Sequence, residues 1–389
     1  MAITMLISPL ASAGGVNRVS ASVGPRAMAM CGAQIADPID ASAYYYNPAG
    51  LTLIENTALQ CGMEGILAGA RYENAGYSKN SEKELLAMPF GGFSTRLTDR
   101  LSGGIGWHVV GGLGGKYKGD FPWKEGMLNM TEIVPAIAYR FDKLSLGLNL
   151  NVGYAQFTNV APVQLVGRPV EAIGMDANAT GIGVSVGAGL LYRFNDSVTF
   201  GISGVLPNKT PLNGSTKLSL LGLPLLKTKM ETEFTFPGRL GVGLKIKANQ
   251  RLTLLLDGTW YNYEADKNMT AKLGGLFTYR QAMNWHSNFS ANIGAEYAAT
   301  DKLMLRAGFC WHTAAIPKAT QSPIAPEVPG PGVGVGFGYT PSKNWRLDLG
   351  YNYGWGERKV DHHHGFVAPG EYKDSANLVS LSVTRFFGK

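Results

Sequence analysis

Apolar and polar residues alternate along most of this chain. Between Trp345 and Trp355, one set of alternate positions is aromatic or aliphatic, and the positions between them are Arg, Asp, Gly, Asn and Gly. Because successive side chains of a β-strand point to opposite faces, this segment has one face suited to lipid, with aromatic residues at both ends, and one face suited to water. The pattern is typical of a strand that crosses a membrane.

The same alternation recurs in segments 144–154, 181–194, 289–297 and 303–312. A single strand of this kind would equally suit a soluble β-sandwich, so the recurrence is the informative observation. Each segment has close to the ~9–11 residues that a tilted strand needs to cross a bilayer. The sequence has no charge-free apolar run of the ~18 residues that would make a spanning helix. A membrane protein without such helices must close its strands into a barrel, because lipid cannot satisfy open backbone groups.

The alternation predicts an all-β fold, a transmembrane antiparallel up-and-down barrel of about 14 strands. The predicted strands are 57–74, 88–96, 101–113, 128–141, 144–157, 179–194, 197–206, 229–247, 251–264, 285–299, 302–314, 331–341, 344–357 and 376–387. Short connections (98–100, 142–143, 195–196, 248–250, 300–301 and 341–343) alternate with long ones (75–87, 114–127, 158–178, 207–228, 265–284, 315–330 and 358–375). Short turns at one end and long loops at the other are typical of an outer-membrane barrel, and they place both termini on the periplasmic side.

The region before the first strand divides into two parts. A short apolar run, Ile3 to Leu10, ends in Ala11, Ser12 and Ala13, which fits a signal-peptidase site, although the expected basic residues before it are missing. Residues 14–56 are rich in Ala, Gly, Asp and Pro. A barrel of about 14 strands is wider than side chains alone can fill, so this segment is a candidate plug. We therefore predict a residual signal peptide at 1–13, a hatch that plugs the lumen at 14–56 and the barrel at 57–389.

The composition of the 389 residues, 45% hydrophobic and 16% charged, agrees with a membrane barrel. The net charge of +7 comes from scattered basic residues rather than from the clustered patch that a nucleic-acid partner requires. We assign this charge to loops that face anionic lipid headgroups, including lipopolysaccharide, or anionic ligands. The three cysteines (Cys31, Cys61 and Cys310) are odd in number and have no zinc spacing. We expect a monomer without cofactor or metal.

Several short motifs, taken in their order along the chain, resemble one protein family. They are Gly24 to Ala33, Ala36-Asp37, Asp40 to Ser42, Asn47 to Leu51, Pro237 to Leu244, Ile293 to Tyr297, Leu305 to Gly308 and Leu347 to Tyr351. They resemble the hatch and the strands of the outer-membrane long-chain fatty acid transporter family, which includes aromatic-hydrocarbon channels. The resemblance covers nearly the whole mature chain. It implies a fourteen-stranded barrel with a hatch, located in the outer membrane of a Gram-negative bacterium, that takes up hydrophobic small molecules passively.

The resemblance also implies a lateral opening at a kinked third strand. The glycines of that predicted strand are the candidates for the opening: Gly103, Gly104, Gly106, Gly111 and Gly112. Glycine weakens strand pairing and permits bulges, so a wall defect is physically reasonable there. The alternative is that these glycines only relieve crowding in a curved wall.

Asn47, Pro48 and Ala49 lie where the hatch gives way to the first strand. Proline fixes its own φ and restrains the residue before it, and an Asn side chain can bond to nearby backbone, so the three residues suit a rigid turn. The resemblance implies that this turn lies beside the wall gap and helps to gate ligand exit. A purely structural corner is the alternative.

Two predicted loops are unusually apolar. One contains Leu220, Leu221, Leu223, Leu225 and Leu226, and the other contains Leu165, Val166 and Arg168. Exposed loops seldom carry so much aliphatic surface unless they pack on something or bind something apolar. We expect the two loops to form the groove that first captures ligand. The alternative, which does not exclude the first, is a lid of two loop segments packed on each other.

A fatty acid carboxylate that enters a dry site needs a cation or oriented N–H donors. Arg168 in the apolar loop, Arg26 in the hatch and Arg306 on an inward strand face are the candidates. The alternative for each is an ordinary ion pair of the lumen or the loops. An uncharged hydrocarbon would need no such partner.

Two further motifs do not point to chemistry. Gly183 to Gly187 spells the G-x-S-x-G pattern of hydrolases, but it lies inside an alternating strand and leaves Ser185 in the lumen with no assigned base. His362 to His364 lie in a long loop where adjacent side chains diverge, which favours a solvated loop over a metal site. We therefore expect a protein that is not an enzyme.

Two other classes of function stay open at this point. The first is a non-transporting barrel that serves as a scaffold of a secretion or envelope assembly, and a lumen without an apolar pocket would favour it. The second is an outer-membrane hydrolase, which would require a Ser, a His and an acid that meet at the barrel rim.

Overall fold

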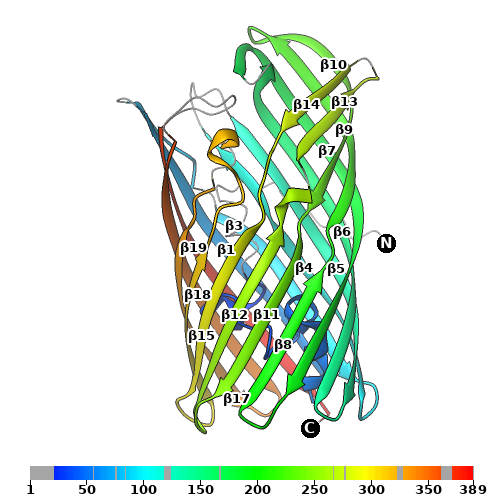
Figure 1. The fold of residues 1–389 in the computed structure, drawn as a ribbon, viewed down its shortest axis with the longest axis vertical. Coiled ribbons are helices and arrows are strands. Elements are labelled where there is room, and N and C mark those ends of the chain that lie inside the picture. Colours follow the sequence, from blue (N-terminus) through cyan, green and yellow to red (C-terminus); the bar gives the residue numbers. More distant parts are fainter. Residues whose placement is uncertain are drawn as a thin grey trace.

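The computed structural model of the chain describes residues 22–55, 57–74, 77–83, 85–117, 124–165, 168–265, 267–275, 277–321, 327–360 and 370–388. In this part of the chain, nineteen strands form one sheet that closes on itself where β1 pairs antiparallel with β19 (Figure 1). Fourteen strands follow one another around the wall, in the order β1, β3, β4, β5, β6, β7, β8, β11, β12, β15, β16, β17, β18 and β19. The prediction of a fourteen-stranded antiparallel barrel is confirmed.

The strands are β1 Thr57–Asn74, β2 Tyr77–Asn80, β3 Leu85–Arg96, β4 Leu101–Lys116, β5 Glu125–Phe141, β6 Leu144–Leu165, β7 Arg168–Arg193, β8 Val198–Val205, β9 Asn208–Leu220, β10 Leu223–Phe236, β11 Gly238–Lys247, β12 Leu252–Asn262, β13 Asn268–Leu273, β14 Phe277–Ala282, β15 Asn288–Ala298, β16 Leu303–His312, β17 Gly330–Ser342, β18 Trp345–Val360 and β19 Gly370–Phe387. The helices are α1 Pro25–Ala29, α2 Ala43–Tyr46 and the 3-10 turns η1 Pro48–Leu53, η2 Tyr263–Ala265 and η3 Lys318–Thr320. No helix in the described ranges is long and apolar enough to cross a membrane.

Short turns join the wall strands at one end of the barrel, where the C-terminus also lies (Figure 1). Polar side chains fix several of these turns. The Asn195 carboxamide oxygen accepts hydrogen bonds from the backbone N–H groups of Ser197 and Val198, each at 2.9 Å, and Asn249 repeats this arrangement one hairpin later. Such side chains mimic a backbone turn, which explains why the short connections could be located from the sequence.

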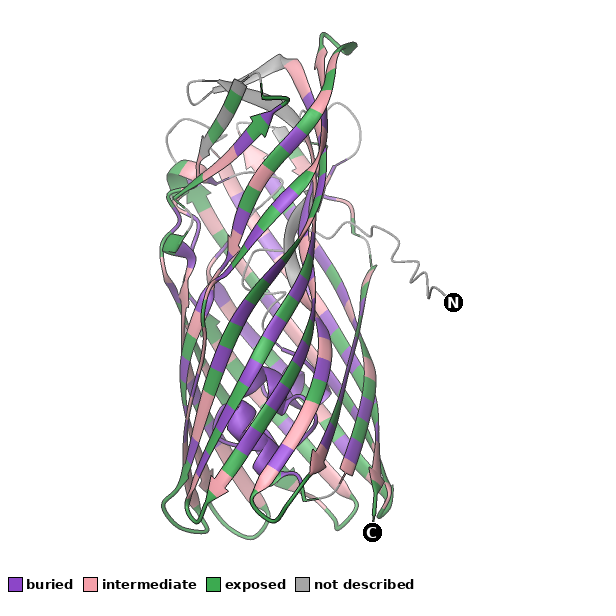
Figure 2. Cartoon of the chain, turned by 90° about the vertical axis from the view of Figure 1, so that its right-hand side faces the viewer, coloured by how far each residue is buried: buried purple, intermediate pink, exposed green. Residues whose placement is uncertain are grey.

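The two faces of each wall strand differ as the alternation predicts (Figure 2). On β7, the outward Ile182 and Val184 are 63% and 54% exposed, whereas Ser185 between the outward positions is buried. On β18, Leu347 and Leu349 are exposed and Asp348 is buried. The apolar rows therefore form the lipid-facing surface, and the glycine-rich and polar rows form the inner surface.

Three of the predicted long loops are wrong, because segments 158–178, 207–228 and 265–284 are largely strand. Strands β6 and β7 continue pairing to Leu165 and Arg168, and β9 and β10 form a hairpin that turns at Leu221 and Gly222. Beyond the membrane, both faces of a hairpin meet water. The apolar alternation that marks a strand in lipid therefore fades there.

The predicted strand 229–247 is also wrong, because it is interrupted at Pro237. Val205 pairs with Arg239 and Asn208 pairs with Phe236, so Pro207 and Pro237 occupy the same rung of one long hairpin. Neither proline has an N–H group for the ladder. Beyond this rung, the inward positions change from odd to even numbers on both strands, which turns Asn208 and Phe236 toward the lumen.

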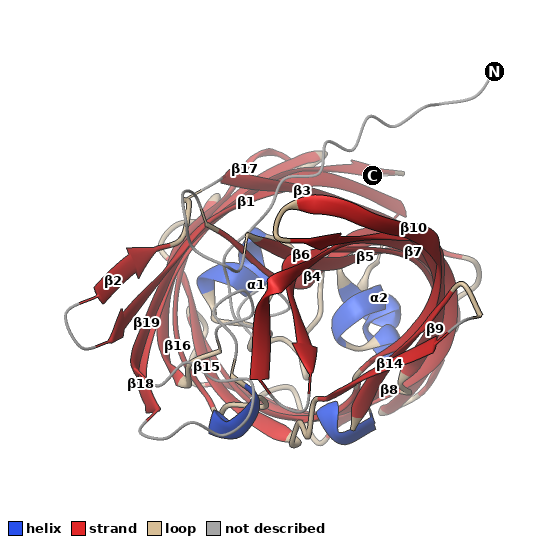
Figure 3. Ribbon diagram, turned by 90° about the horizontal axis from the view of Figure 1, so that it is seen from above, coloured by secondary structure: helices blue, strands red, loops and turns tan. Residues whose placement is uncertain are grey.

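The N-terminal segment lies inside the barrel with α1, α2 and η1, as predicted for the hatch (Figure 3), and its helices occupy the lower part of the lumen (Figure 2). The glycines of the inner wall make room for it. A Cβ atom at Gly106 would lie 2.0 Å from the Tyr44 ring, and one at Gly308 would lie 2.4 Å from the backbone of Met30. The hatch therefore contacts the wall more closely than any larger residue would allow.

Candidate ligand pocket and wall opening

An apolar pocket lies between the hatch and the outer hairpins. Its apolar lining comes from several strands and includes Leu128, Met130, Phe234, Phe236 and Tyr261. It contains about 770 Å³ of space free of protein atoms, part of which is open to solvent. The cavity that a water-sized sphere can enter measures only about 80 Å³, below the ~300–1,000 Å³ that is usual for small-molecule sites, so a ligand of that size needs the lining side chains to move apart.

One side of this pocket forms because the inward-facing positions switch from odd to even numbers at the rung of Pro207 and Pro237. The even positions of β10 point inward only because the strand is interrupted, and they deliver Phe234 and Phe236 to the lumen. The two rings contact each other edge to face with centroids 5.1 Å apart. On the opposite side, β5 needs no interruption, because Leu128 and Met130 are alternate inward residues of a continuous strand.

The polar end of the pocket joins the hatch to two strands. The Arg239 guanidinium lies 3.8 Å from the centroid of the Tyr45 ring and donates a hydrogen bond to the Tyr45 carbonyl oxygen. Glu132 also lines the pocket, and its Oε2 lies 3.5 Å from Nε2 of His108. Burial raises the pKa of the Tyr45 hydroxyl, and Arg239 opposes this only in part, so Tyr45 presents a neutral phenol. Among the described lining residues, Arg239 and Glu132 carry the formal charges, and the two are opposite.

The barrel wall is interrupted between β3 and β4. Their ladder runs from Arg96 paired with Ser102 to Gly91 paired with Trp107 and ends there. Beyond it, within the described ranges, β3 pairs only with β1 and β4 pairs only with β5. A hydrogen bond of 2.8 Å from the Glu82 N–H to the Lys116 carbonyl joins the two sides again further out. The β3–β4 ladder is therefore interrupted between residues 85–90 and 108–115, and we call this interruption the slit.

Strand β4 bends into the barrel along this slit. Its register with β5 shifts between Val110 and Leu113. Odd-numbered residues of this strand face the lipid. Val109 is odd-numbered, yet it packs on lumenal residues that include Met28 and Met88. Val110, the next residue, lines the ligand pocket. Two neighbouring valines therefore separate the pocket from the slit.

The glycines predicted for the lateral opening fall into two groups. Gly103, Gly104 and Gly106 lie in the paired part of β4, where Gly104 and Gly106 make room for Leu51 and Tyr44 of the hatch. This matches the alternative of relieved crowding. Gly111 and Gly112 lie at the register shift beside the slit.

The turn at Asn47, Pro48 and Ala49 is held by several hydrogen bonds. The Asn47 carboxamide donates to the carbonyls of Ile35 at 2.9 Å and Leu190 at 3.0 Å, and its oxygen accepts the Ala49 N–H at 3.1 Å. Pro48 and Ala49 lie directly over Gly147 of β6. The turn thus contacts β6 and β7, whereas Tyr44 is one of the hatch residues next to β4, and its hydroxyl donates to the Trp107 carbonyl at 3.0 Å. A gating role for the turn stays a prediction.

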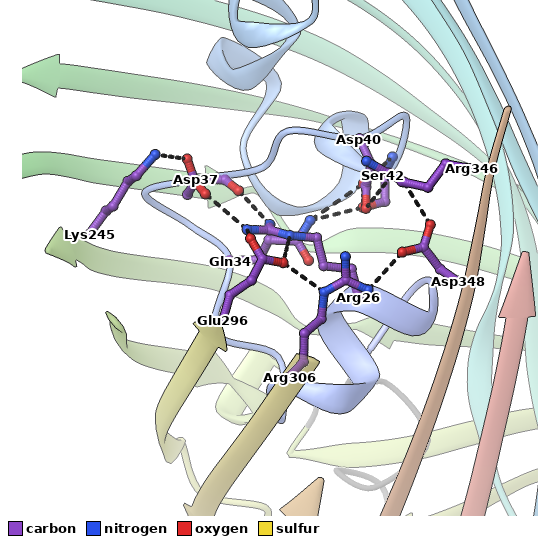
Figure 4. Close-up of polar contacts among 10 residues, drawn as sticks. All are labelled: Arg26, Gln34, Asp37, Asp40, Ser42, Lys245, Glu296, Arg306, Arg346 and Asp348. Atoms are coloured by element: carbon purple, nitrogen blue, oxygen red, sulfur yellow. Dashed lines mark hydrogen bonds and ion pairs between the residues drawn. The ribbon is translucent and has the colours of Figure 1, made fainter. Parts of the chain in front are cut away.

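A buried ionic network fastens the hatch to the opposite side of the barrel (Figure 4). Arg26 is fully buried and contacts Asp37 at 2.9 Å and Glu296 at 3.1 Å. Arg306 contacts Glu296 at 2.6 Å and Asp348 at 2.7 Å. The charged groups of the network balance, with four basic residues (Arg26, Lys245, Arg306 and Arg346) and four acidic ones (Asp37, Asp40, Glu296 and Asp348).

Two of the predicted ligand partners, Arg26 and Arg306, belong to this network. Both form ion pairs where the hatch meets the wall and are not among the residues that line the pocket, so their geometry is that of ordinary lumenal ion pairs. The predicted leucines lie at the tip of the β9–β10 hairpin, where Leu221 and Leu223 are 78% and 72% exposed, away from the pocket lining. The side chains of Leu165 and Arg168, and residues 1–21, 166–167 and 361–369, which include Val166 and His362 to His364, lie outside the described part.

The sequence reasoning missed Tyr45, His108, Glu132 and Arg239. His108, Glu132 and Arg239 are titratable residues at inward positions of wall strands, but Glu296, Arg306 and Asp348 share this pattern, so it does not single out the pocket. Ser185 also lines the pocket, and its buried hydroxyl has no hydrogen-bond partner among the described residues.

Comparisons with known proteins agree with this architecture. A sequence profile described as "Outer membrane protein transport protein (OMPP1/FadL/TodX)" matches residues 4–387. A Pseudomonas aeruginosa FadL homologue of known structure is 16% identical, with a TM-score of 0.85 over 94% of this chain and 98% of its own. The Pseudomonas putida toluene transporter TodX is 17% identical (TM-score 0.80; 95% and 100% covered), and the Ralstonia pickettii toluene transporter TbuX is 19% identical (TM-score 0.79; 95% and 99% covered). No curated protein sequence matches the chain.

Proposed function

Because this chain belongs to the OMPP1/FadL/TodX family of outer-membrane transport proteins, we propose that it is a passive uptake channel for hydrophobic small molecules, namely long-chain fatty acids or related hydrocarbons. It is a Gram-negative outer-membrane β-barrel with the fold of hydrophobic-compound channels, and it is a transport protein rather than an enzyme. Ligand binds in the apolar pocket above the hatch and leaves sideways through the slit beside β4.

The observation that carries this proposal is the position of Val109 and Val110. Val110 faces the pocket, and Val109 faces the apolar cluster behind the slit. A ligand needs only a displacement of this bent segment to pass from one compartment to the other. The same bend places His108 against Tyr44 and Tyr45 of the hatch, with ring centroids 5.7 and 4.9 Å apart. Movement of the bent segment and of the hatch tyrosines is thereby linked.

The pocket favours an uncharged ligand. Arg239 would attract a carboxylate, but Glu132 in the same lining repels it, and an unpaired charge in an apolar pocket is costly. We therefore place neutral hydrocarbons, including aromatic ones, before fatty acids among the ligands. Capture by the leucines of the β9–β10 tip precedes binding in the pocket.

A cross-link across the slit tests lateral release. In a background with Cys31, Cys61 and Cys310 changed to Ser, Leu86→Cys and Val109→Cys are introduced, because both wild-type side chains pack on the same cluster behind the slit. Oxidation should stop the uptake of a labelled hydrocarbon into cells, and a reductant should restore it. The control pair, Phe93→Cys with Ile105→Cys, lies on an intact rung of the same two strands and should leave uptake unchanged.

Equal uptake by the oxidised and reduced slit variant, once mass spectrometry has verified the cross-link, would refute lateral release. Loss of uptake in the control pair as well would show that any stiffening of β3 and β4 blocks transport, and this too would remove the slit as the exit. The scaffold alternative predicts no ligand in the pocket. Mass spectrometry of lipids and hydrocarbons that co-purify with the protein tests it.

A further inference from the structure

Two cysteines that are 279 positions apart in the sequence (310 − 31) meet inside the barrel. The Cys31 sulfur of the hatch lies 3.7 Å from the Gly332 carbonyl oxygen and accepts a hydrogen bond from Asn352 at 3.1 Å. Cys310 pairs with Gly332 across β16 and β17, and a Cβ atom at Gly332 would lie 2.8 Å from the Cys310 sulfur. The absence of a side chain at Gly332 thus leaves the space where both sulfurs lie.

The two thiols interact directly. A hydrogen bond between the Cys31 and Cys310 side chains, together with burial, raises the pKa of the Cys31 thiol well above its ordinary value. Cys310 occupies an inward position of β16, between the lipid-facing Phe309 and Trp311. Cys61 differs from both, because it is exposed on the outer face of β1.

The backbone of the hatch is shaped to present Cys31 to the wall. Cys31 has a φ of +53°, in the left-handed region that residues other than glycine rarely occupy. The conformation ends α1, and the following Gly32 donates its N–H to the Ala27 carbonyl at 2.8 Å. Asn292 of β15 holds the Cys31 carbonyl oxygen. The strained residue is therefore fixed from both sides, with its sulfur directed toward Cys310.

We propose that Cys31 and Cys310 form a disulfide bond in the mature protein and so fasten the hatch covalently to β16. An outer-membrane protein is assembled from an oxidising compartment, the periplasm, where disulfides form and persist. A cysteine thiolate attacks a disulfide donor, and the second thiolate then displaces the donor. The two electrons and two protons that the cysteines lose end on the donor, which leaves as a dithiol.

The bond joins the part of the hatch that the ionic network already holds. Arg26 and Asp37 lie on either side of Cys31 in the sequence and are bound to β15 and β11. This half of the hatch then stays seated, and the tyrosines next to β4 remain as the movable part. The inference itself does not depend on transport, because the contact between the two sulfurs is independent of what the pocket binds.

Thiol counting tests the bond. Protein is taken from outer membranes under acid quench, denatured and alkylated without reductant. Of the three cysteines in the wild-type protein, Cys61 alone should be alkylated, because the other two are bonded. The Cys61→Ser variant should show no alkylation until a reductant exposes both partners, and Cys31→Ser should instead free Cys310. Peptide mapping of the wild-type protein without reductant should recover one linked species that contains both residues.

Folding of each variant is verified by its heat-modifiable migration in a detergent gel. Cys61→Ser is a conservative change on the lipid face and provides the decisive sample. If Cys31 and Cys310 of this folded variant are both alkylated without reductant, the disulfide does not exist and the inference is overturned.

Discussion

Arg26 of the hatch and Glu296 of β15 are joined by two hydrogen bonds, from Nε to Oε2 at 3.1 Å and from Nη2 to Oε1 at 3.3 Å, with both side chains buried. Removal of one partner of a buried pair leaves an uncompensated charge, which costs about 3–5 kcal/mol. We expect the loss of stability in Arg26→Ala to be near the lower limit of this range. Both acidic partners of Arg26 keep another ion pair, Asp37 with Lys245 and Glu296 with Arg306. The measurement is hydrogen exchange of the hatch amides.

The control for Arg26 is an ion pair on the surface. Lys209 and Glu233 lie 2.9 Å apart, and both are well exposed, so Lys209→Ala should change the stability by less than about 1 kcal/mol. Equal protection of the hatch in the two variants would show that the network does not hold it.

Gly106 tests the close contact between hatch and wall. In Gly106→Ala the new methyl group would lie 2.0 Å from the Tyr44 ring, which must move and lose its hydrogen bond to the Trp107 carbonyl. Overpacking of this kind costs about 1–3 kcal/mol in the free energy of unfolding, measurable by urea titration. Gly204→Ala is the matched control, since its methyl group would meet neighbours at an ordinary 3.5 Å. A similar small loss in both variants would contradict the contact.

Glu132 tests the charge preference of the pocket. Glu132→Gln leaves Arg239 as the unmatched charge of the described lining. We expect carboxylate ligands to bind about tenfold more tightly, equivalent to about 1.4 kcal/mol, and uncharged hydrocarbons to bind as before. Competition against a fluorescent hydrophobic probe measures both classes in one assay. An unchanged ratio between the two classes would show that the head of a ligand does not reach Arg239.

The leucines of the β9–β10 tip test ligand capture. Leu221→Ser, Leu223→Ser and Leu225→Ser together should raise the half-saturating ligand concentration of uptake by about tenfold or more and leave the maximal rate unchanged. Burial of one leucine against a ligand contributes ~1.5–3 kcal/mol. Lys227→Ser with Lys229→Ser, exposed positions of the same hairpin, is the control. Unchanged uptake in the leucine variant would remove the capture step.

Glu327, in the loop before β17, should make that loop sensitive to pH. Burial raises the pKa of its carboxyl from 4.5 to about 7, although the N–H groups of Ile316 and Ala315 oppose the shift. Since the folded state binds this proton more tightly than the unfolded state, stability falls as the pH rises from about 4.5 to about 7. The amide of Ala315, which donates to Glu327 at 2.7 Å, should lose protection from exchange over this interval. In Glu327→Gln, a pH dependence that remained after correction for intrinsic exchange would refute this assignment.

The membrane part of the wall was predictable because lipid lies on one side of each strand and the lumen on the other, which imposes the alternation seen in Leu347 to Tyr351. The outer hairpins escaped prediction because water lies on both sides of them. The pocket escaped for another reason. Its residues, such as Met130, Phe234 and Tyr261, come from strands far apart in the sequence, and the inward direction of Phe234 depends on an interruption at Pro237.

The contacts between charged residues and between the cysteines could not be predicted without the register of the strands. Arg306 was visible as an inward cation, but its partner Asp348 is 42 residues away and becomes a neighbour only when β16, β17 and β18 are aligned. The same holds for Cys31 and Cys310, whose spacing in the sequence carries no information. The hatch, in contrast, was visible as a segment without alternation before the first strand.

The glycines that face the hatch have a consequence for inheritance and for engineering. Gly106, Gly147 and Gly308 leave room for Tyr44, Pro48 and Met30 respectively, so the inner surface of the wall is complementary in shape to this hatch. A hatch from a relative with bulkier residues at positions 30, 44 and 48 would clash with the wall backbone. A relative's barrel with alanine in place of the three glycines would clash with this hatch. Chimaeras that exchange only one of the two parts should therefore fail to close, and the two parts must diverge together.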